Sequence, residues 1–166
     1  MGRALDVDAV RAAFGTKAIV QFRGAHAALS NMHRTSFTFR GRVCASAEHA
    51  YQAFKSSDQA DQNSVFAAPT PKTAKARGKR VTATAGFFEG HEARVALMRE
   101  VISAKFARNS PMATKLIDTG DHPLVEGSTW GDRFWGATVR QGVAAGDNWL
   151  GRLLEERRDA LRQAAE

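Results

Sequence analysis

The sequence predicts a mainly α-helical protein with a small β component, and three observations support this fold class. In residues 92–107, apolar residues recur every three or four positions and keep one helix face apolar over about four turns. Several other stretches begin with a helix-capping residue, in two cases followed by proline. The alternation typical of strands is confined to short runs. The chain has 166 residues and is expected to form one compact domain with a sizeable core.

The expected elements follow in order along the chain. Asp6 caps a first helix that ends at Phe14, and residues 18–23 form a strand. A hairpin around Gly41 leads directly into a helix at 46–55. Later helices, each bounded by a cap, a proline or a glycine, are expected at residues 58–67, 71–78, 92–107, 112–118 and from 147 onward, with Asp147 as the last cap. A short strand is expected at 124–126, and irregular structure at 82–90 and 127–146.

Composition limits the classes of function. Lys and Arg number 24 against 17 Asp and Glu, which gives a net charge of +7. This surface favours phosphate-bearing partners, from nucleotides to nucleic acid, although an arginine-rich composition without any binding role would look the same. There is no apolar run of membrane-spanning length, and Cys44 is the only cysteine. We therefore expect a cytoplasmic protein that does not associate with membranes.

Metal and cofactor sites are not indicated by the motifs. His49 and His91 have no second ligand at metal-binding spacing, so a structural role is expected for both. The sequence also contains no glycine-rich phosphate loop and no serine-hydrolase elbow. We expect neither a metal nor a cofactor.

The most informative stretch is residues 46–55, SAEHAYQAFK. Ser46 caps the helix, and its apolar residues fall on one face. Glu48, Gln52 and Lys55 share a second face, turned about 100° from the first. Glu48 and Lys55 are roughly 10 Å apart along the axis, too far for an ion pair, so each needs another partner or a ligand between them. The alternative is that this polar face simply meets water, with Glu48 favoured by the helix dipole.

A second informative stretch is residues 124–136, LVEGSTWGDRFWG. Glu126 and Asp132 stand beside Trp130 and Trp135 in a loop with three glycines. Carboxylates and indoles together are suited to a site that stacks a planar base and stabilises a cationic sugar. The alternative is that both tryptophans fill the core beneath the loop while Asp132 caps it locally. Residue types alone leave both interpretations open.

Several motifs occur in order over about residues 20–160. They are Leu29-Ser30-Asn31-Met32, Ser46-x-Glu48-His49-x-Tyr51-Gln52-Ala53-x-Lys55, Lys105-Phe106-x-x-Asn109, Thr119-Gly120, Leu124-Val125-Glu126-Gly127, Trp130-Gly131-Asp132-x-x-Trp135-Gly136 and Asn148-x-Leu150-Gly151. In these motifs the sequence resembles the NADAR or YbiA-like domain family, which includes N-glycosidases of riboflavin intermediates. The resemblance implies a YbiA-like domain at residues 18–166, preceded by a helical extension at 1–17.

The resemblance also implies a ligand built from ribose phosphate, such as ADP-ribose, and hydrolysis of an N-glycosidic bond. The substrate is expected to be ADP-ribose attached to guanine in nucleic acid. Ribosylamino-pyrimidine intermediates of riboflavin synthesis are the alternative substrate, and a non-catalytic module that binds NAD or ADP-ribose is the alternative class. Many riboflavin-type members have a Trp and an acidic residue where this chain has Gly90 and His91. Phe87, Phe88 or Trp130 are the candidates to replace that Trp.

Roles for individual residues follow from the chemistry and the resemblance together. Glu48 is the candidate to stabilise positive charge on the ribose, and Lys55 to donate a proton, bind phosphate or form a Schiff base. Asp132 and Glu126 are further candidates for acid–base catalysis. The expected substrate contacts are Arg23, Asn31, Gln52, Glu126, Trp130, Trp135 and Asn148.

Overall fold

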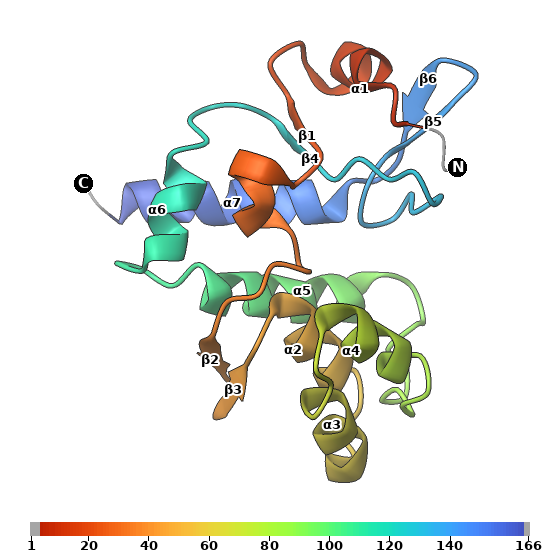
Figure 1. Ribbon diagram of the computed structural model, residues 1–166, viewed down its shortest axis with the longest axis vertical. Coiled ribbons are helices and arrows are strands. Elements are labelled where there is room, and N and C mark those ends of the chain that lie inside the picture. Colours follow the sequence, from red (N-terminus) through yellow and green to blue (C-terminus); the bar gives the residue numbers. More distant parts are fainter. Residues whose placement is uncertain (1–3, 165–166) are drawn as a thin grey trace. The chain divides into compact units, whose positions relative to one another are not determined.

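The computed structural model describes residues 4–164, which form seven α-helices, one 3-10 helix and six short strands (Figure 1). The mainly α fold class with a small β component is therefore confirmed. The chain divides into two compact units. The middle unit is Asn31–Ala107, and the terminal unit combines the segments on either side of it. Across residues 4–164, no helix has both the length and the apolar content that a membrane crossing requires.

The middle unit is built around helix α2 (Ala47–Phe54). Its other elements are β2 (Phe37–Phe39), β3 (Arg42–Cys44), α3 (Gln59–Phe66), α4 (Pro71–Gly78) and α5 (Glu92–Lys105). Helix α2 packs against α3, α4, α5 and β3, so it is covered on several sides. Small buried side chains such as Ala53 and Ala74 permit this close packing, and Phe54 contacts the rings of Phe39 and Phe66 edge-on.

The terminal unit contains short strands covered by helices. Its elements are α1 (Val7–Phe14), β1 (Ile19–Val20), the 3-10 helix η1 (Gly24–Leu29), α6 (Pro111–Ile117), β4 (Leu124–Val125), β5 (Thr138–Arg140), β6 (Val143–Ala145) and α7 (Trp149–Gln163). Strands β1 and β4 pair in parallel, with Ile19 opposite Leu124. Helix α1 packs on β1, β5 and β6, while α7 packs on α6 and β4.

The helix starts are explained by their caps. The side chains of Asp6, Ser46, Asp58 and Thr70 each accept the backbone N–H three residues further on, as a capping residue should. Pro71 occupies the first turn of α4, where its missing N–H costs nothing. These four expected starts are confirmed.

Three local expectations are wrong. Residues 127–146 are not entirely irregular, because β5 and β6 form an antiparallel hairpin. Its turn residues Gln141 and Gly142 have φ of 51° and 75°, the left-handed pair that a tight two-residue turn requires. The strand expected at 18–23 is limited to Ile19–Val20, because the backbone turns at Gln21, where φ is 71°. Helix α7 is not capped by Asp147: its N-cap is Asn148, whose side chain makes no capping bond.

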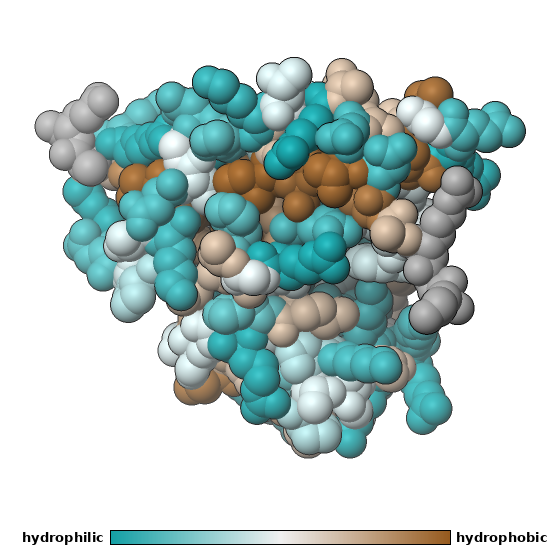
Figure 2. All heavy atoms as spheres, turned by 45° about the horizontal axis from the view of Figure 1, so that its top comes forward, coloured by the Kyte–Doolittle hydropathy of each residue, from teal (hydrophilic) through white to brown (hydrophobic). Residues whose placement is uncertain are grey.

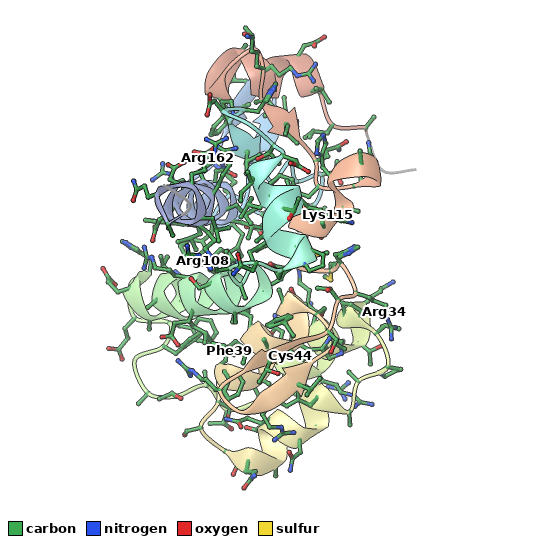
Figure 3. The ribbon with its side chains drawn as sticks, turned by 90° about the vertical axis from the view of Figure 1, so that its left-hand side faces the viewer. Arg34, Phe39, Cys44, Arg108, Lys115 and Arg162 are labelled. Atoms are coloured by element: carbon green, nitrogen blue, oxygen red, sulfur yellow. The ribbon has the colours of Figure 1, made fainter. Side chains whose placement is uncertain are left out.

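The surface is largely polar. Figure 2 shows many hydrophilic residues on the visible face, together with a band of hydrophobic ones. Arg162 of α7 illustrates how basic side chains are held there, since it forms an ion pair with Asp121 at 2.7 Å (Figure 3). Such exposed pairs contribute little to stability.

Candidate active site

The rotation of α2 is fixed by its first turn. Ser46 Oγ accepts the backbone N–H of His49 at 3.2 Å and donates to His49 Nδ1 at 2.7 Å. The other ring nitrogen of His49 donates to the carbonyl of Ala68 at 3.0 Å. With both ring nitrogens bonded, His49 is a buried structural residue, as expected from the sequence.

The polar face of α2 is buried rather than solvated. Glu48, Gln52 and Lys55 are only 6%, 8% and 7% exposed, so the water-facing alternative is wrong. Gln52 Nε2 donates to Glu48 Oε1 at 2.7 Å, and Lys55 Nζ donates to the carbonyl oxygen of Gly78 at 2.6 Å. The acid and the amine are thus held by different partners, as their separation along the helix requires.

Burial sets the electrostatics of this helix. It lowers the pKa of Lys55 below the ordinary lysine value, because a desolvated ammonium is unfavourable, and the negative charge of Glu48 partly opposes this shift. Near neutral pH, Lys55 is therefore more often a neutral amine than an exposed lysine is. A neutral amine can act as a nucleophile or a base, whereas an ammonium cannot.

Asn31 joins the same group at the start of the middle unit. Its carbonyl accepts the backbone N–H of Glu48 at 3.0 Å. This N–H lies in the first turn of α2, where the helix itself supplies no acceptor. Its side-chain Nδ2 donates to Met98 Sδ at 3.5 Å. Of the predicted site residues, the structure brings together Asn31, Glu48, Gln52 and Lys55.

Gly78 contacts two of these residues, Lys55 and Gln52, and was not predicted from the sequence. Its carbonyl holds Lys55, and a Cβ added at this position would lie only 2.1 Å from Gln52 Oε1. Any larger residue would therefore force Gln52 away from its present position. Gly78 reads in the sequence only as a helix stop; its contact with α2 depends on how α4 packs.

Gly78→Ala is expected to lower kcat/KM roughly 10- to 100-fold, because small displacements of catalytic groups are costly. It should also lower the free energy of unfolding by about 1–3 kcal/mol through overpacking. Helix propensity alone predicts the opposite sign for a Gly→Ala change. Steady-state kinetics and urea unfolding measure both effects, with the exposed Ala76→Ser as a control on the same helix.

The double variant Gly78→Ala/Gln52→Ala separates crowding from other causes. It should recover stability relative to Gly78→Ala, because the added methyl group gains room, but it should not recover activity. A double variant as unstable as Gly78→Ala would contradict the proposed contact.

The tryptophan loop of the terminal unit is held by Asp132. Its carboxylate accepts the backbone N–H groups of Phe134 at 3.1 Å and Trp135 at 2.9 Å, and its own N–H donates to Ser128 Oγ at 3.0 Å. The local capping role is therefore confirmed. Trp130 is 64% exposed, so the idea that both tryptophans fill the core is wrong. Trp135 is half-buried and packs edge-on against Phe134, with 4.7 Å between the ring centroids.

Trp130 lies at the edge of a cavity within the terminal unit. The cavity has a volume of about 390 Å³ and is lined by residues 4–6, 128–131 and 138–142. The turn of the β5–β6 hairpin forms one of its walls. This hairpin, which the sequence did not predict, therefore shapes the surroundings of Trp130.

The remaining predicted site residues lie elsewhere in the terminal unit. Asn148 is buried, and its amide accepts the N–H of Glu126 at 3.1 Å and donates to the carbonyl of Leu124 at 2.9 Å. It thereby joins the start of α7 to β4. Glu126 is half-buried beside this clamp, and Arg23 is exposed immediately before η1.

Two other reactive side chains are buried in the middle unit. Burial raises the pKa of the Cys44 thiol on β3 to about 11, which makes it a poor nucleophile (Figure 3). Burial lowers the pKa of Lys105 to about 7, and its Nζ lies 4.9 Å from the centroid of the Phe106 ring. Lys105 belongs to one of the sequence motifs but was not predicted as a site residue.

Comparisons with known proteins agree with the fold and the motifs. The family model described as the NADAR domain matches residues 20–162. A riboflavin biosynthesis protein of Vibrio vulnificus (strain YJ016) is 36% identical over 143 residues, which cover 84% of this chain and 37% of that protein. The chain thus spans well under half of this relative's length. The NMR structure of the E. coli protein YbiA is similar with a TM-score of 0.73 and 25% identity, covering 90% of this chain and 88% of that one.

Proposed function

Because the chain belongs to the NADAR domain family, we propose that it is an N-glycosyl hydrolase that cleaves the C1′–N bond between a ribose and a base. The observation that carries this proposal is the buried face of α2. There a carboxylate, an amide and an amine of lowered pKa are held by fixed partners. The name of the Vibrio relative, a riboflavin biosynthesis protein, is compatible with chemistry on a ribosylated base.

In the proposed reaction the C1′–N bond breaks and its electron pair goes to the base nitrogen, which takes up a proton. The ribose ring then carries positive charge, which the carboxylate of Glu48 stabilises. Water adds to C1′ and gives up a proton, so the products are the free base and a ribose with a hydroxyl at C1′. Gln52 orients Glu48 through their 2.7 Å hydrogen bond.

Lys55 has two roles open to it. As an ammonium it donates a proton to the leaving base or binds phosphate. As a neutral amine it attacks C1′ of a ring-opened ribosylamine, the base leaves as its amine, and water then hydrolyses the lysine imine. The lowered pKa of Lys55 favours the second role.

The other predicted residues contribute to substrate binding in this proposal. Asp132 stays a candidate for acid–base work in the terminal unit, where its carboxylate also accepts the backbone N–H of Trp135. Asn31 in the middle unit, and Arg23, Glu126, Trp130 and Trp135 in the terminal unit, stay candidates for polar contacts and stacking, whereas the amide of Asn148 is already used to hold Leu124 and Glu126.

The proposed substrate is ADP-ribose linked to guanine in nucleic acid. The chain has 24 basic and 17 acidic residues, and this excess of positive charge supports a substrate rich in phosphate. The second candidate is a ribosylamino-pyrimidine phosphate of riboflavin synthesis, which the name of the Vibrio relative favours.

Parallel measurements of kcat/KM on both substrates test this choice. We expect the value for an oligonucleotide bearing ADP-ribosyl-guanine to exceed that for the ribosylamino-pyrimidine phosphate. The reverse order would assign the chain to the riboflavin intermediates. Binding of ADP-ribose without turnover of either substrate would identify a reader and overturn the hydrolase proposal.

A further inference from the structure

Helix α4 and the residues just after it carry a concentration of positive charge. Its basic residues are Lys72, Lys75, Arg77, Lys79 and Arg80. The sequence has no acidic residue between Asp61 and Glu89. These positive charges are therefore not balanced by acidic residues within the same stretch of chain.

Helix geometry places three of these cations in one row. Lys72, Lys75 and Lys79 are spaced three and four residues apart, so they fall within about 60° of the helix surface. Lys72 and Lys79 are exposed, and Lys75 is half-buried beside them. Arg80, also exposed, follows directly after Lys79, which keeps helical backbone angles as the C-cap. We call Lys72, Lys75, Lys79 and Arg80 the α4 basic face.

The helix dipole does not explain this charge pattern. It favours cations in the last turn of a helix and carboxylates in the first. Helices α1, α2, α3 and α5 each have an acidic residue in the first turn. Helix α4 has none there and carries Lys72 instead. The positive charge of Lys72 is therefore not accounted for by the stability of its own helix.

The charges of the α4 basic face are not paired with carboxylates. Within residues 4–164, no ion pair to a carboxylate involves any of its four side chains. Asp61 on the neighbouring helix α3 is bound elsewhere: its carboxylate accepts Ser56 Oγ at 3.0 Å and the backbone N–H of Thr82 at 2.9 Å. The α4 basic face is therefore available to an anion from solution.

The α4 basic face adjoins the candidate active site through Gly78. Helix α4 packs against α2 in the middle unit (Figure 1). The carbonyl of Gly78, the residue before Lys79, accepts a hydrogen bond from Lys55 Nζ at 2.6 Å. An extended polyanion bound along α4 would therefore pass next to the helix end that holds Lys55.

The row of lysines has the length of a short piece of nucleic-acid backbone. Lys72 and Lys79 are about 10 Å apart along the axis, at 1.5 Å per residue. Phosphates of one strand advance by about 3.4 Å each in a duplex, so the row spans about three of them. Residues 71–80 include no aromatic side chain on which a base could stack. The row is therefore suited to phosphates rather than to bases.

We propose that the α4 basic face binds the phosphate backbone of a single nucleic-acid strand next to the modified base. The partner is a single strand, because an enzyme that acts on a base needs that base outside a stacked duplex. Contacts to phosphates carry no sequence information, so the affinity is the same for strands of different sequence. This inference deepens the proposed function and rests on its nucleic-acid substrate.

Fluorescence anisotropy with an unmodified single-stranded oligonucleotide tests the inference without turnover. The triple variant Lys72→Gln/Lys79→Gln/Arg80→Gln removes the exposed charges of the α4 basic face. It should raise Kd roughly 10- to 100-fold near 0.1 M salt, because about three phosphate contacts are lost. The slope of log K against log salt concentration should become shallower by about 2, at about 0.7 per phosphate.

The matched control removes the same charges from the terminal unit. The variant Lys17→Gln/Lys115→Gln/Arg152→Gln also replaces two exposed lysines and one exposed arginine. Its Kd should change less than 3-fold, and both triple variants should keep the melting temperature of the unaltered protein. Equal losses of affinity in the two variants would overturn the proposal, because binding would then follow net charge alone. An unchanged salt slope in the α4 variant would also overturn it.

Activity provides a second, separate readout. The α4 variant should lower kcat/KM for an oligonucleotide bearing ADP-ribosyl-guanine by a larger factor than for ADP-ribosyl-guanosine, which has no flanking phosphates. Failure of the unaltered protein to bind the oligonucleotide would overturn the role of the α4 basic face, even if small ribosylated bases are hydrolysed. Absence of hydrolysis of any substrate would refute the proposed function, whereas the Kd values alone decide whether this face binds the strand.

Discussion

Glu48→Gln is expected to lower kcat/KM by roughly 10²- to 10⁴-fold, the range associated with loss of a positioned acid–base group. The replacement keeps the size of the side chain and an oxygen that can still accept from Gln52 Nε2. It removes only the negative charge that stabilises the developing ribose cation. Substrate binding and the fold should therefore be largely retained.

Removing this charge should also act on Lys55. The Glu48 carboxylate raises the pKa of Lys55 against the larger effect of burial, so its loss should lower that pKa further. Chromatographic assays of base release measure the effect on activity. Glu100→Gln is the matched control, because Glu100 is an exposed residue of the middle unit whose main contact is an ion pair with Arg40 at 2.7 Å. Equal activities of the two variants would exclude Glu48 from catalysis.

Lys55→Met is expected to lower kcat/KM by roughly 10²-fold or more. The change removes the amine that is hydrogen-bonded to the carbonyl oxygen of Gly78. Lys55→Arg retains a positive charge but cannot supply a neutral amine near neutral pH. If Lys55 is the nucleophile, both variants are inactive. If it binds only phosphate, the Arg variant retains most of the activity.

The direction in which kcat/KM changes with pH distinguishes the two roles of Lys55. A nucleophilic Lys55 must be neutral, so kcat/KM should rise with pH through the Lys55 pKa, which burial places below the ordinary value of 10.5. If Lys55 donates a proton, kcat/KM should fall with pH over the same range.

Borohydride trapping tests the Schiff-base route directly. Borohydride should trap the unaltered protein covalently on its substrate, but not Lys55→Met, and the exposed Lys115→Met variant should be trapped like the unaltered protein. Absence of any adduct would contradict the Schiff-base route.

The helices could be predicted wherever the local chemistry decides the structure. Thr70 followed by Pro71 starts α4, and Ser46 starts α2, through bonds within one turn. The β5–β6 hairpin carries a weaker signal, because Gln-Gly is a less obvious turn than Asn-Gly. Asp147 is not the cap because α7 starts one residue later, after Asn148 in a left-handed conformation. The amide of Asn148 holds β4, a contact between segments distant in sequence, and makes no capping bond.

The candidate site could likewise be predicted only in part from the sequence. The shared face of Glu48, Gln52 and Lys55 follows from helix geometry, but its burial depends on α3, α4 and α5 packing around α2. The contact of Gly78 with Gln52 likewise depends on how α4 packs against α2. Residue spacing can place side chains on one face of a helix, whereas tertiary packing decides what covers that face.

The central claim is that the Glu48–Lys55 face of α2 hydrolyses a ribose–base bond. The most direct measurement is chromatography of an oligonucleotide bearing ADP-ribosyl-guanine after incubation with the unaltered protein or with Glu48→Gln. We predict free ADP-ribose and an oligonucleotide with intact guanine from the unaltered protein, and almost none from the variant. Equal release by both proteins would contradict the role of this helix face, and release by neither would contradict the assigned substrate.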